Sequence, residues 1–316
     1  MFDGLATIRG SASTLTAVRP LLSTFRVGRA VDRHLIIDDS RVSQDHGFLR
    51  FMRDKVWVVR DLASKNGTFV NGRRIEAGSD IVLADQDVIC FGSTSSSWIF
   101  TAGSPSEVVI SSSGGASWRA VAPGVGLLPL PSEHEPSGSL LRRQTEWLLE
   151  APGFESRVLA DGQPFTVAGV EYRAWMSRAD DPTVETDVHR VPLASAVLYL
   201  AVSQDEEQIA AELRVSAGAR ILPARVYLYL LVLLARHRLE DTALGISPSE
   251  AGWRYADEIA QALAVDQQSL NVQVYRARSD VEKLAFQDSS SIIERRSMTR
   301  QMRIGVPSEK LTLARL

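Results

Sequence analysis

Three polar loops between residues 28 and 72 carry side chains that could hold a phosphate group. They are Gly28-Arg29, Ser43-Gln44-Asp45-His46 and Ser64-Lys65-Asn66-Gly67, the last followed by Asn71-Gly72. An arginine offers a planar fork of donors to phosphate oxygens, and hydroxyl and amide groups add further hydrogen bonds. Holding a phosphate in this way requires no catalytic group. The pattern therefore indicates binding rather than catalysis.

The sequence between these loops consists of short apolar runs. Leu35–Ile37, Gly47–Phe51 and Val56–Val59 are rich in β-branched and aromatic residues, which favours strands. Asn66-Gly67 and Asn71-Gly72 are turn dipeptides, because both residue types tolerate positive φ. Short strands at this spacing predict a β-sandwich whose polar loops gather at one end.

From about Thr14 to Phe100 the sequence resembles a forkhead-associated (FHA) domain. The pattern of that family is Gly-Arg, Ser-x-x-His, Ser-x-Asn-Gly-Thr and Asn-Gly, and every element stands here in order. FHA domains bind phosphothreonine peptides, so the resemblance implies the same activity here. It implies a phosphopeptide site made by Arg29, Ser43, Gln44, Lys65 and Asn66.

The chemistry of these residues agrees with that role. A phosphothreonine carries roughly −1.5 to −2 charge and three strong acceptor oxygens. Arg29 and the Ser43 hydroxyl are expected to donate to the phosphate, and the Asn66 amide to hold the neighbouring peptide backbone. Gln44 and Lys65 differ from the residues most common at their positions, but both remain donors. Phosphate binding is therefore expected, while the peptide preference stays open.

The remaining motif residues are predicted to brace the loops. Gly28, Asn71 and Gly72 fit turns, and His46 is expected to hydrogen-bond across loops rather than act as a base or a metal ligand. The alternative is a degenerate FHA domain that only mediates oligomerisation. Such domains normally lose the arginine or the serine, and this sequence keeps both.

Length and composition set the broad class of the protein. The chain has 316 residues, enough for two or three domains, and a formal net charge of −3, so no global field attracts nucleic acid or membranes. It has no apolar run long enough to cross a membrane and no Cys/His cluster with metal-ligand spacing, and its first residues lack the charged start and apolar core that would predict a signal peptide. Its one cysteine, Cys90, is predicted to be buried. We therefore expect a cytoplasmic protein with no membrane partner, metal or cofactor, and the absence of catalytic motifs predicts that it is not an enzyme.

Four segments are expected along the chain, giving a multidomain protein. Residues 1–102 form the all-β FHA sandwich, and 103–139, dense in Ser, Gly and Pro, form a linker in which 117–121 could add a strand. Residues 140–195 form a β-rich middle segment that begins with a short helix near 140–150 and includes a hairpin at Ala168-Gly169. Residues 196–316 form a C-terminal α+β domain.

The C-terminal segment is expected to contain strands over 197–222, then three helices, then a hairpin. The helices start at Pro223 and end near 238, run through 255–263, and follow Asp266, a candidate N-cap, to Leu284. The hairpin strands are 292–296 and 301–306. This order, and the run Val272-Gln273-Val274-Tyr275-Arg276-Ala277-Arg278, resemble the OmpR-type winged helix-turn-helix.

The resemblance implies that the third helix enters the DNA major groove and that the hairpin contacts phosphates. Residues 271–306 carry seven Lys/Arg against four Asp/Glu, which permits this. The expected DNA-binding residues lie on the helix face off its buried stripe and in the hairpin; they are Asn271, Gln273, Arg276, Arg278, Lys283, Arg295, Arg296 and Arg300.

Two functions follow from these expectations. The first is a transcription regulator whose FHA domain docks a phosphothreonine of a Ser/Thr kinase or its substrate and whose winged helix binds DNA. Phosphorylation would then control recruitment, homodimerisation or promoter occupancy. The second is an adaptor that does not bind DNA, in which the winged helix docks a protein partner or only packs against a sheet. DNA binding that falls steeply with salt would separate the two.

Overall fold

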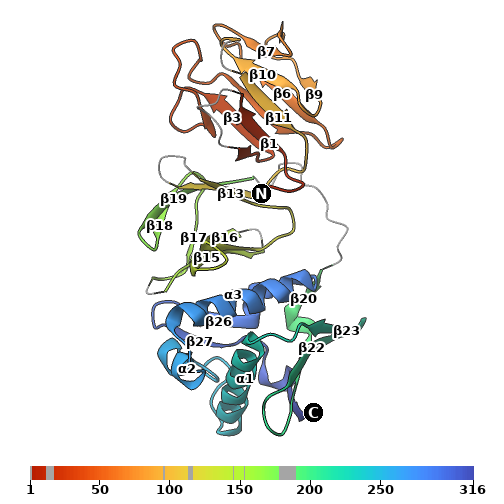
Figure 1. The fold of residues 1–316 in the computed structure, drawn as a ribbon, viewed down its shortest axis with the longest axis vertical. Coiled ribbons are helices and arrows are strands. Elements are labelled where there is room, and N and C mark those ends of the chain that lie inside the picture. Colours follow the sequence, from red (N-terminus) through yellow and green to blue (C-terminus); the bar gives the residue numbers. More distant parts are fainter. Residues whose placement is uncertain are drawn as a thin grey trace. The chain divides into compact units, whose positions relative to one another are not determined.

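The computed structural model describes residues 2–11, 18–94, 97–112, 117–144, 146–152, 154–177 and 190–316 (Figure 1). The chain forms two compact units, each made of two separate stretches of sequence. The first unit comprises Met1–Val125 and Ala160–Thr186, and the second comprises Gly126–Leu159 and Asp187–Leu316.

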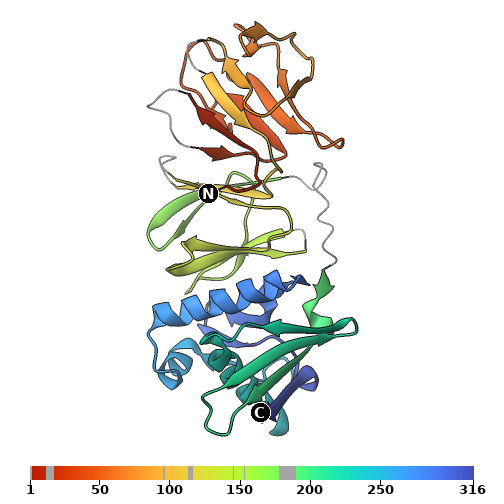
Figure 2. The ribbon, with the colours of Figure 1, turned by 45° about the vertical axis from the view of Figure 1, so that its right-hand side comes forward.

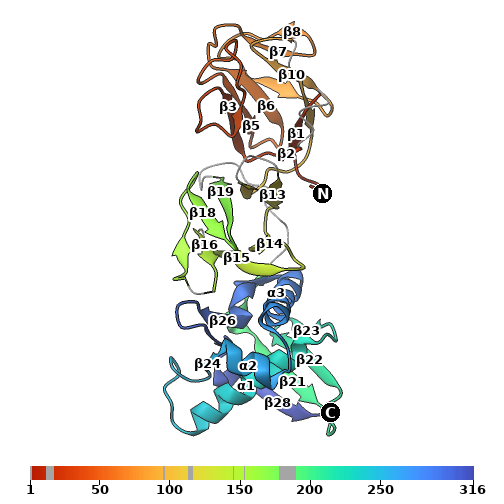
Figure 3. The same ribbon diagram turned by 60° about the vertical axis from the view of Figure 1, so that its left-hand side comes forward.

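The N-terminal part of the first unit is a sandwich of two sheets, seen as two layers in Figure 3. One sheet has the order β2(Arg19–Pro20), β1(Thr7–Gly10), β11(Ser97–Thr101), β10(Val88–Phe91), β7(Thr68–Val70), β8(Arg73–Arg74). The other has the order β4(Leu35–Ile36), β3(Thr24–Gly28), β5(Gly47–Phe51), β6(Trp57–Asp61), β9(Ile81–Leu83). The predicted β-sandwich and its three predicted strands are confirmed, and Thr14, the expected start of the domain, lies outside the described residues.

Apolar side chains from both sheets fill the space between the layers. Phe25 and Leu49 from one sheet, and Ile89 and Phe100 from the other, have no exposed surface. Cys90 is also buried, as predicted. This packed interior makes the sandwich a rigid base for the loops at its end.

A four-stranded sheet completes the first unit and shows that part of the predicted linker forms strands. Its order is β13(Trp118–Val121), β12(Val108–Ser112), β19(Val170–Met176), β18(Pro164–Val167). β13 and the hairpin turn at Ala168-Gly169, with φ of 51° and 76°, match the predictions. β12 was expected to be linker, but pairing with β19, about sixty residues later, buries Val108, Val109 and Ile110. Residues 178–189 of the expected middle segment lie outside the described residues.

Another four-stranded sheet, in the second unit, replaces the rest of the predicted linker and the predicted short helix. Its order is β14(Leu127–Pro131), β15(Pro136–Arg143), β16(Glu146–Glu150), β17(Arg157–Val158). The helix predicted near 140–150 is absent, because these residues form β15 and β16. Antiparallel pairing of Leu140 with Leu149 buries both side chains, which a short isolated helix could not do.

The rest of the second unit contains the predicted strands, helices and hairpin. Its helices are α1(Tyr227–Ala243), α2(Ala256–Ala262) and α3(Gln267–Lys283). Its strands are β20(Val191–Pro192), β21(Val197–Val202), β22(Ile209–Val215), β23(Gly218–Leu222), β24(Arg254–Tyr255), β25(Phe286–Gln287), β26(Ile293–Arg296), β27(Gln301–Ile304) and β28(Leu311–Arg315). β21 pairs with β22, and the hairpin β26–β27 also pairs with β24. β28 adds to β21 in parallel.

The first helix starts and ends later than predicted. It was expected to start at Pro223 and to end near residue 238, but it starts at Tyr227 and runs to Ala243. Arg238 and Asp241 are both buried in its last turns, where Arg238 donates to the Ile304 carbonyl and Asp241 pairs with Arg254. Because both buried side chains have partners, the helix continues past residue 238, where its cations had suggested a C-terminus.

α3 has the predicted cap and buried stripe. The Asp266 carboxylate accepts the Ser269 amide at 2.6 Å, and Leu270, Val274, Ala277 and Val281 are buried. Figures 1 and 2 show α3 running along the sheet β14–β17. None of the helices in the described part of the chain has the length and hydropathy of a membrane-spanning segment.

Candidate functional site

Hydrogen bonds join the three loops that carry the five predicted phosphopeptide residues. Arg29 follows β3, and its amide donates to the Ser43 carbonyl at 3.0 Å. The Lys65 amide, in the loop between β6 and β7, donates to the Ser43 hydroxyl at 3.1 Å. The Asn66 side-chain amide donates to the Arg41 carbonyl at 2.7 Å. The structure thus brings the three motif loops together.

The charged ends of this site face solvent. Arg29, Gln44 and Lys65 are exposed, and Ser43 and Asn66 are partly exposed. The Nε of Arg29 donates to the Val42 carbonyl at 3.3 Å, which fixes the guanidinium against the second loop. Among the described residues this is the one hydrogen bond of the Arg29 side chain. Its terminal amino groups are therefore available for an oxyanion.

His46 joins two of the loops from beneath. Its ring is fully buried, its Nδ1 accepts the Ser43 amide at 3.1 Å, and its Nε2 lies 3.2 Å from the Gly67 carbonyl oxygen. This bonding requires the neutral ring with hydrogen on Nε2. Burial lowers the pKa of His46, more than the Gly67 carbonyl and Asp61 raise it. The prediction that His46 braces loops is confirmed.

Asp61 is a second buried brace, which the sequence reasoning missed. Its carboxylate accepts the Ser64 amide at 2.8 Å, the Ser64 hydroxyl at 2.7 Å and the Thr68 hydroxyl at 2.6 Å. Burial acts to raise the pKa of Asp61, but these hydrogen bonds outweigh it and hold the pKa below its ordinary value. The available signal was an aspartate three residues before Ser64, the spacing at which an N-cap aspartate accepts a backbone amide.

Two glycines are required by the loop geometry. A Cβ on Gly28 would overlap the carbonyl oxygen of Gln44, so only glycine allows the first two loops to approach. Gly67 has φ of 83°, in the region that favours glycine, and a Cβ there would meet the Arg74 guanidinium. Gly28 was predicted in a turn, but it is the last residue of β3. Its close contact with the second loop explains why the arginine follows a glycine.

Residues 25–92 match the family model described as "FHA domain". These residues form an FHA domain. An FHA domain-containing protein of Arabidopsis thaliana is 40% identical over 72 residues, which is 22% of this chain. The chain spans 18% of the length of that curated relative.

Two solved structures resemble about a third of this chain. One FHA domain, from a study of phosphothreonine-dependent FHA interactions, is 28% identical with a TM-score of 0.28, covering 31% of this chain and 96% of its own. Mycobacterium tuberculosis EmbR, in complex with a low-affinity phosphopeptide, is 28% identical with a TM-score of 0.28, covering 32% of this chain and 25% of its own.

The residues predicted to contact DNA are arranged differently from the expectation. Arg278 and Gln273 were expected on the exposed face of α3, but their exposed fractions are 3% and 8%. Arg278 forms two hydrogen bonds with Glu150 at the end of β16, at 2.7 and 3.2 Å. The expected exposure was wrong for both residues. For Arg278 the reason is that β14–β16, which lie in residues predicted as linker and short helix, form a sheet that packs on α3 and supplies Glu150.

Most of the other predicted DNA contacts already have partners. Lys283 pairs with Asp280 at 3.0 Å, Arg296 pairs with Glu250 at 2.7 Å, and Arg295 donates to the Asn271 side-chain oxygen at 2.8 Å. Arg276 and Arg300 are exposed, and among the described residues neither side chain has an ion-pair partner. The structure therefore does not collect the eight residues into one open basic face.

Proposed function

We propose that the chain is a phosphothreonine-dependent signalling protein whose FHA domain docks a phosphorylated Ser/Thr kinase or its substrate in the cytoplasm. Arg29 and Ser43 hold the phosphate, Gln44 and Lys65 flank it with further donors, and Asn66 holds the peptide backbone. The domain acts by binding and not by catalysis. The observation that carries this proposal is the Arg29 guanidinium, fixed through Nε while its terminal donors face solvent.

The energetics favour this arrangement for a dianion. Each hydrogen bond to a charged group contributes about 1.5–3 kcal/mol net, more than a neutral one. The loops are held in place by buried bonds to His46 and Asp61, so little ordering cost remains on binding. Fluorescence anisotropy with a phosphothreonine peptide and its unphosphorylated twin tests the proposal. Equal affinity for the two peptides would refute it.

We also propose that the helices and hairpin of the second unit form a winged helix. The order α1, α2, α3, β26, β27, with β24 pairing to the hairpin, supports this. Of the two roles for such a domain, the geometry favours the adaptor, in which the winged helix packs on a sheet or docks a protein. The buried Arg278–Glu150 pair is the observation that supports this choice.

Charge supports the adaptor as well. DNA binding requires several cations free to neutralise phosphates. Of the six cationic side chains predicted for that role, Arg278, Lys283 and Arg296 pair with carboxylates. A regulator that binds DNA through α3 would first have to move the sheet β14–β17 away from the helix, breaking the buried pair.

Genome-wide DNA pull-down with the purified chain at two salt concentrations tests this choice. The adaptor predicts no shared motif among recovered fragments, and equal results for the chain and for Arg276→Ala. Enriched sites with a common motif, lost at high salt, would support the transcription regulator instead. Weakening by about 1–3 kcal/mol in Arg276→Ala would then identify a base contact.

A further inference from the structure

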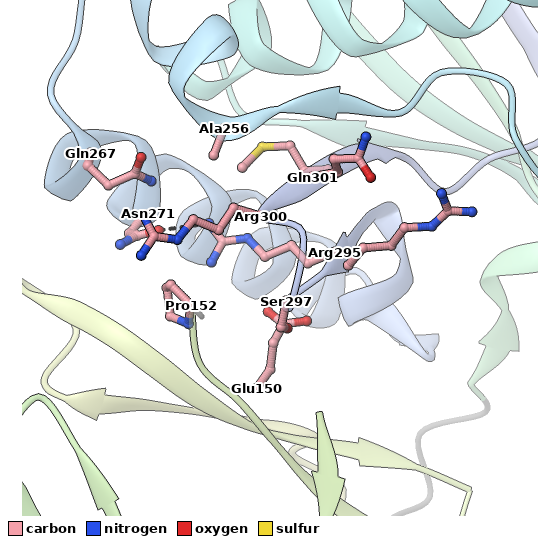
Figure 4. Close-up of a pocket in the computed structure, with 11 residues that line it drawn as sticks. Glu150, Pro152, Ala256, Gln267, Asn271, Arg295, Ser297, Arg300 and Gln301 are labelled. Carbon is pink, nitrogen blue, oxygen red and sulfur yellow. Dashed lines mark hydrogen bonds between the residues drawn. The ribbon is translucent and has the colours of Figure 1, made fainter. Parts of the chain in front are cut away.

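A cavity of about 230 Å³ in the second unit lies where three segments meet. Figure 4 shows Glu150 and Pro152, at and after the end of β16, on one side. Gln267 and Asn271 come from the first turns of α3, and Arg295 and Arg300 come from the hairpin β26–β27. The cavity thus has walls from the sheet, the helix and the hairpin together.

The cavity has an excess of positive charge. Glu150 is the one carboxylate that lines it, and both of its oxygens accept hydrogen bonds from Arg278. The negative charge of Glu150 is therefore offset by Arg278, which does not line the cavity. Arg295 and Arg300 line the cavity, and within the described part of the chain neither forms an ion pair with a carboxylate. The positive charges of Arg295 and Arg300 therefore remain without a carboxylate partner in the same cavity.

The Arg295 guanidinium is incompletely satisfied. One terminal nitrogen donates to the Asn271 side-chain oxygen at 2.8 Å, but its buried Nε has no hydrogen-bond partner in the described residues. Burial lowers the pKa of Arg295 to about 10, and the nearby Arg278 adds to that effect while Glu150 opposes it. A half-buried cation whose Nε lacks a partner is costly, and an anion beside it would offset the cost.

Part of the wall is apolar, and Gln267, Ser297 and Gln301 add neutral polar groups to it. Pro152, Ala256 and Met302 line the cavity without charged groups, and Ala256 and Met302 are buried. Small-molecule sites commonly combine such an apolar wall with a few convergent polar groups. The space is below the usual range for drug-sized ligands, so it fits a small molecule.

We propose that this cavity binds a small organic anion, a carboxylate or a phosphate monoester on an apolar body, with Arg295 and Arg300 holding its charge. Asn271 orients the Arg295 guanidinium toward the ligand. Because the walls belong to the sheet, to α3 and to the hairpin, a bound anion contacts all three and stabilises their packing. This site is independent of the phosphothreonine site.

Ligand-observed ¹⁹F NMR on the full chain tests this proposal with three probes. 4-Fluorobenzoate and 4-fluorophenyl phosphate carry the two anionic groups, and 4-fluorobenzamide is the neutral analogue. We expect saturable broadening with at least one anion and none with the amide. Binding of only one anion identifies its head group. If neither anion binds with a Kd below about 10 mM, or if the amide binds equally well, the proposal is overturned.

A pair of arginine variants locates the binding. Arg300 has φ of 54°, a conformation that asparagine tolerates, so Arg300→Asn removes the charge without adding backbone strain. Arg276→Gln removes another exposed charge, from a residue of α3 that does not line the cavity. Anion binding should weaken about tenfold in R300N, equivalent to about 1.4 kcal/mol, and stay unchanged in R276Q. Unchanged binding in R300N, or equal loss in both variants, would contradict the assignment.

Discussion

The Arg278 guanidinium and the Glu150 carboxylate form a buried, bidentate ion pair between α3 and β16. Nη1 of Arg278 lies 2.7 Å from Oε1 of Glu150, and the two side chains are 3% and 6% exposed. Nη2 also donates to the Ile293 carbonyl at 2.6 Å, at the start of the hairpin. One arginine therefore links the sheet, the helix and the hairpin, in the helix that would otherwise be the candidate for reading DNA.

Removing one partner of this pair should destabilise the second unit. Glu150→Ala leaves the Arg278 charge buried without a counter-ion, so we expect a loss of about 3–5 kcal/mol in the free energy of unfolding. Urea denaturation of the full chain measures this value. A loss below about 1 kcal/mol would mean that the sheet does not hold Arg278 in the folded protein.

A double variant separates the pair from the packing around it. Replacing both partners with apolar residues, Glu150→Leu with Arg278→Met, removes both buried charges at once. Such replacements are often neutral, so most of the stability should return. If the two single losses simply add in the double variant, the two side chains do not interact.

Arg29→Ala should abolish phosphopeptide binding and leave the fold intact. The residue is exposed, and its one side-chain hydrogen bond, to the Val42 carbonyl at 3.3 Å, contributes little to stability. Isothermal titration with a phosphothreonine peptide measures the loss, and Arg9→Ala, an exposed arginine on β1, is the matched control. Retained affinity in R29A would move the phosphate contact elsewhere.

Gly28→Ala should weaken both phosphopeptide binding and stability. The added methyl group would overlap the Gln44 carbonyl oxygen, so the first and second loops must separate. We expect destabilisation of about 1–3 kcal/mol, because overpacking forces backbone shifts. Peptide titration and thermal unfolding on the same sample measure both effects. Gly72→Ala is the control, because a Cβ there meets no atom within 4 Å, although its φ of 77° adds some strain.

The stability of the FHA domain should fall as pH drops below 6.5. The folded pKa of His46 lies below its ordinary value of 6.5, so the unfolded chain binds a proton that the folded ring does not. His46 therefore contributes stability above pH 6.5 and progressively loses it at lower pH, by at most about 1.4 kcal/mol per pH unit. Asp61 acts in the same direction only at lower pH, nearer its ordinary value of 3.8.

Amide hydrogen exchange in β5 between pH 7 and 5, corrected for intrinsic rates, measures this dependence. His46→Asn removes the titrating ring, so its slope should be shallower than that of the unaltered chain. Equal slopes for the two proteins would show that His46 does not control this transition.

The second and third FHA loops could be predicted because their signals are local. Ser43 and His46 bond to each other within the second loop, and Asn66-Gly67 encodes a turn in the third. The N-cap of α3 at Asp266 is local in the same sense, because its partner, Ser269, lies three residues away. Short-range hydrogen bonds of this kind are visible in sequence.

The surroundings of α3 could not be predicted, because they depend on distant partners. β14 and β15 lie in a stretch whose Ser, Gly and Pro content indicates a linker, and only pairing between strands buries its leucines. Glu150 is 128 residues from Arg278 in sequence. When the sheet is not known, the sequence places Arg278 and Gln273 on a helix face that is expected to be exposed to solvent.

Titration of the full chain with one peptide in three forms tests the central claim most directly. The peptide carries phosphothreonine, phosphoserine or threonine at a single position within a degenerate sequence. We predict that only the phosphothreonine form binds, and that R29A abolishes that binding. Equal binding of all three forms, or no binding by a chain that is folded, would contradict it.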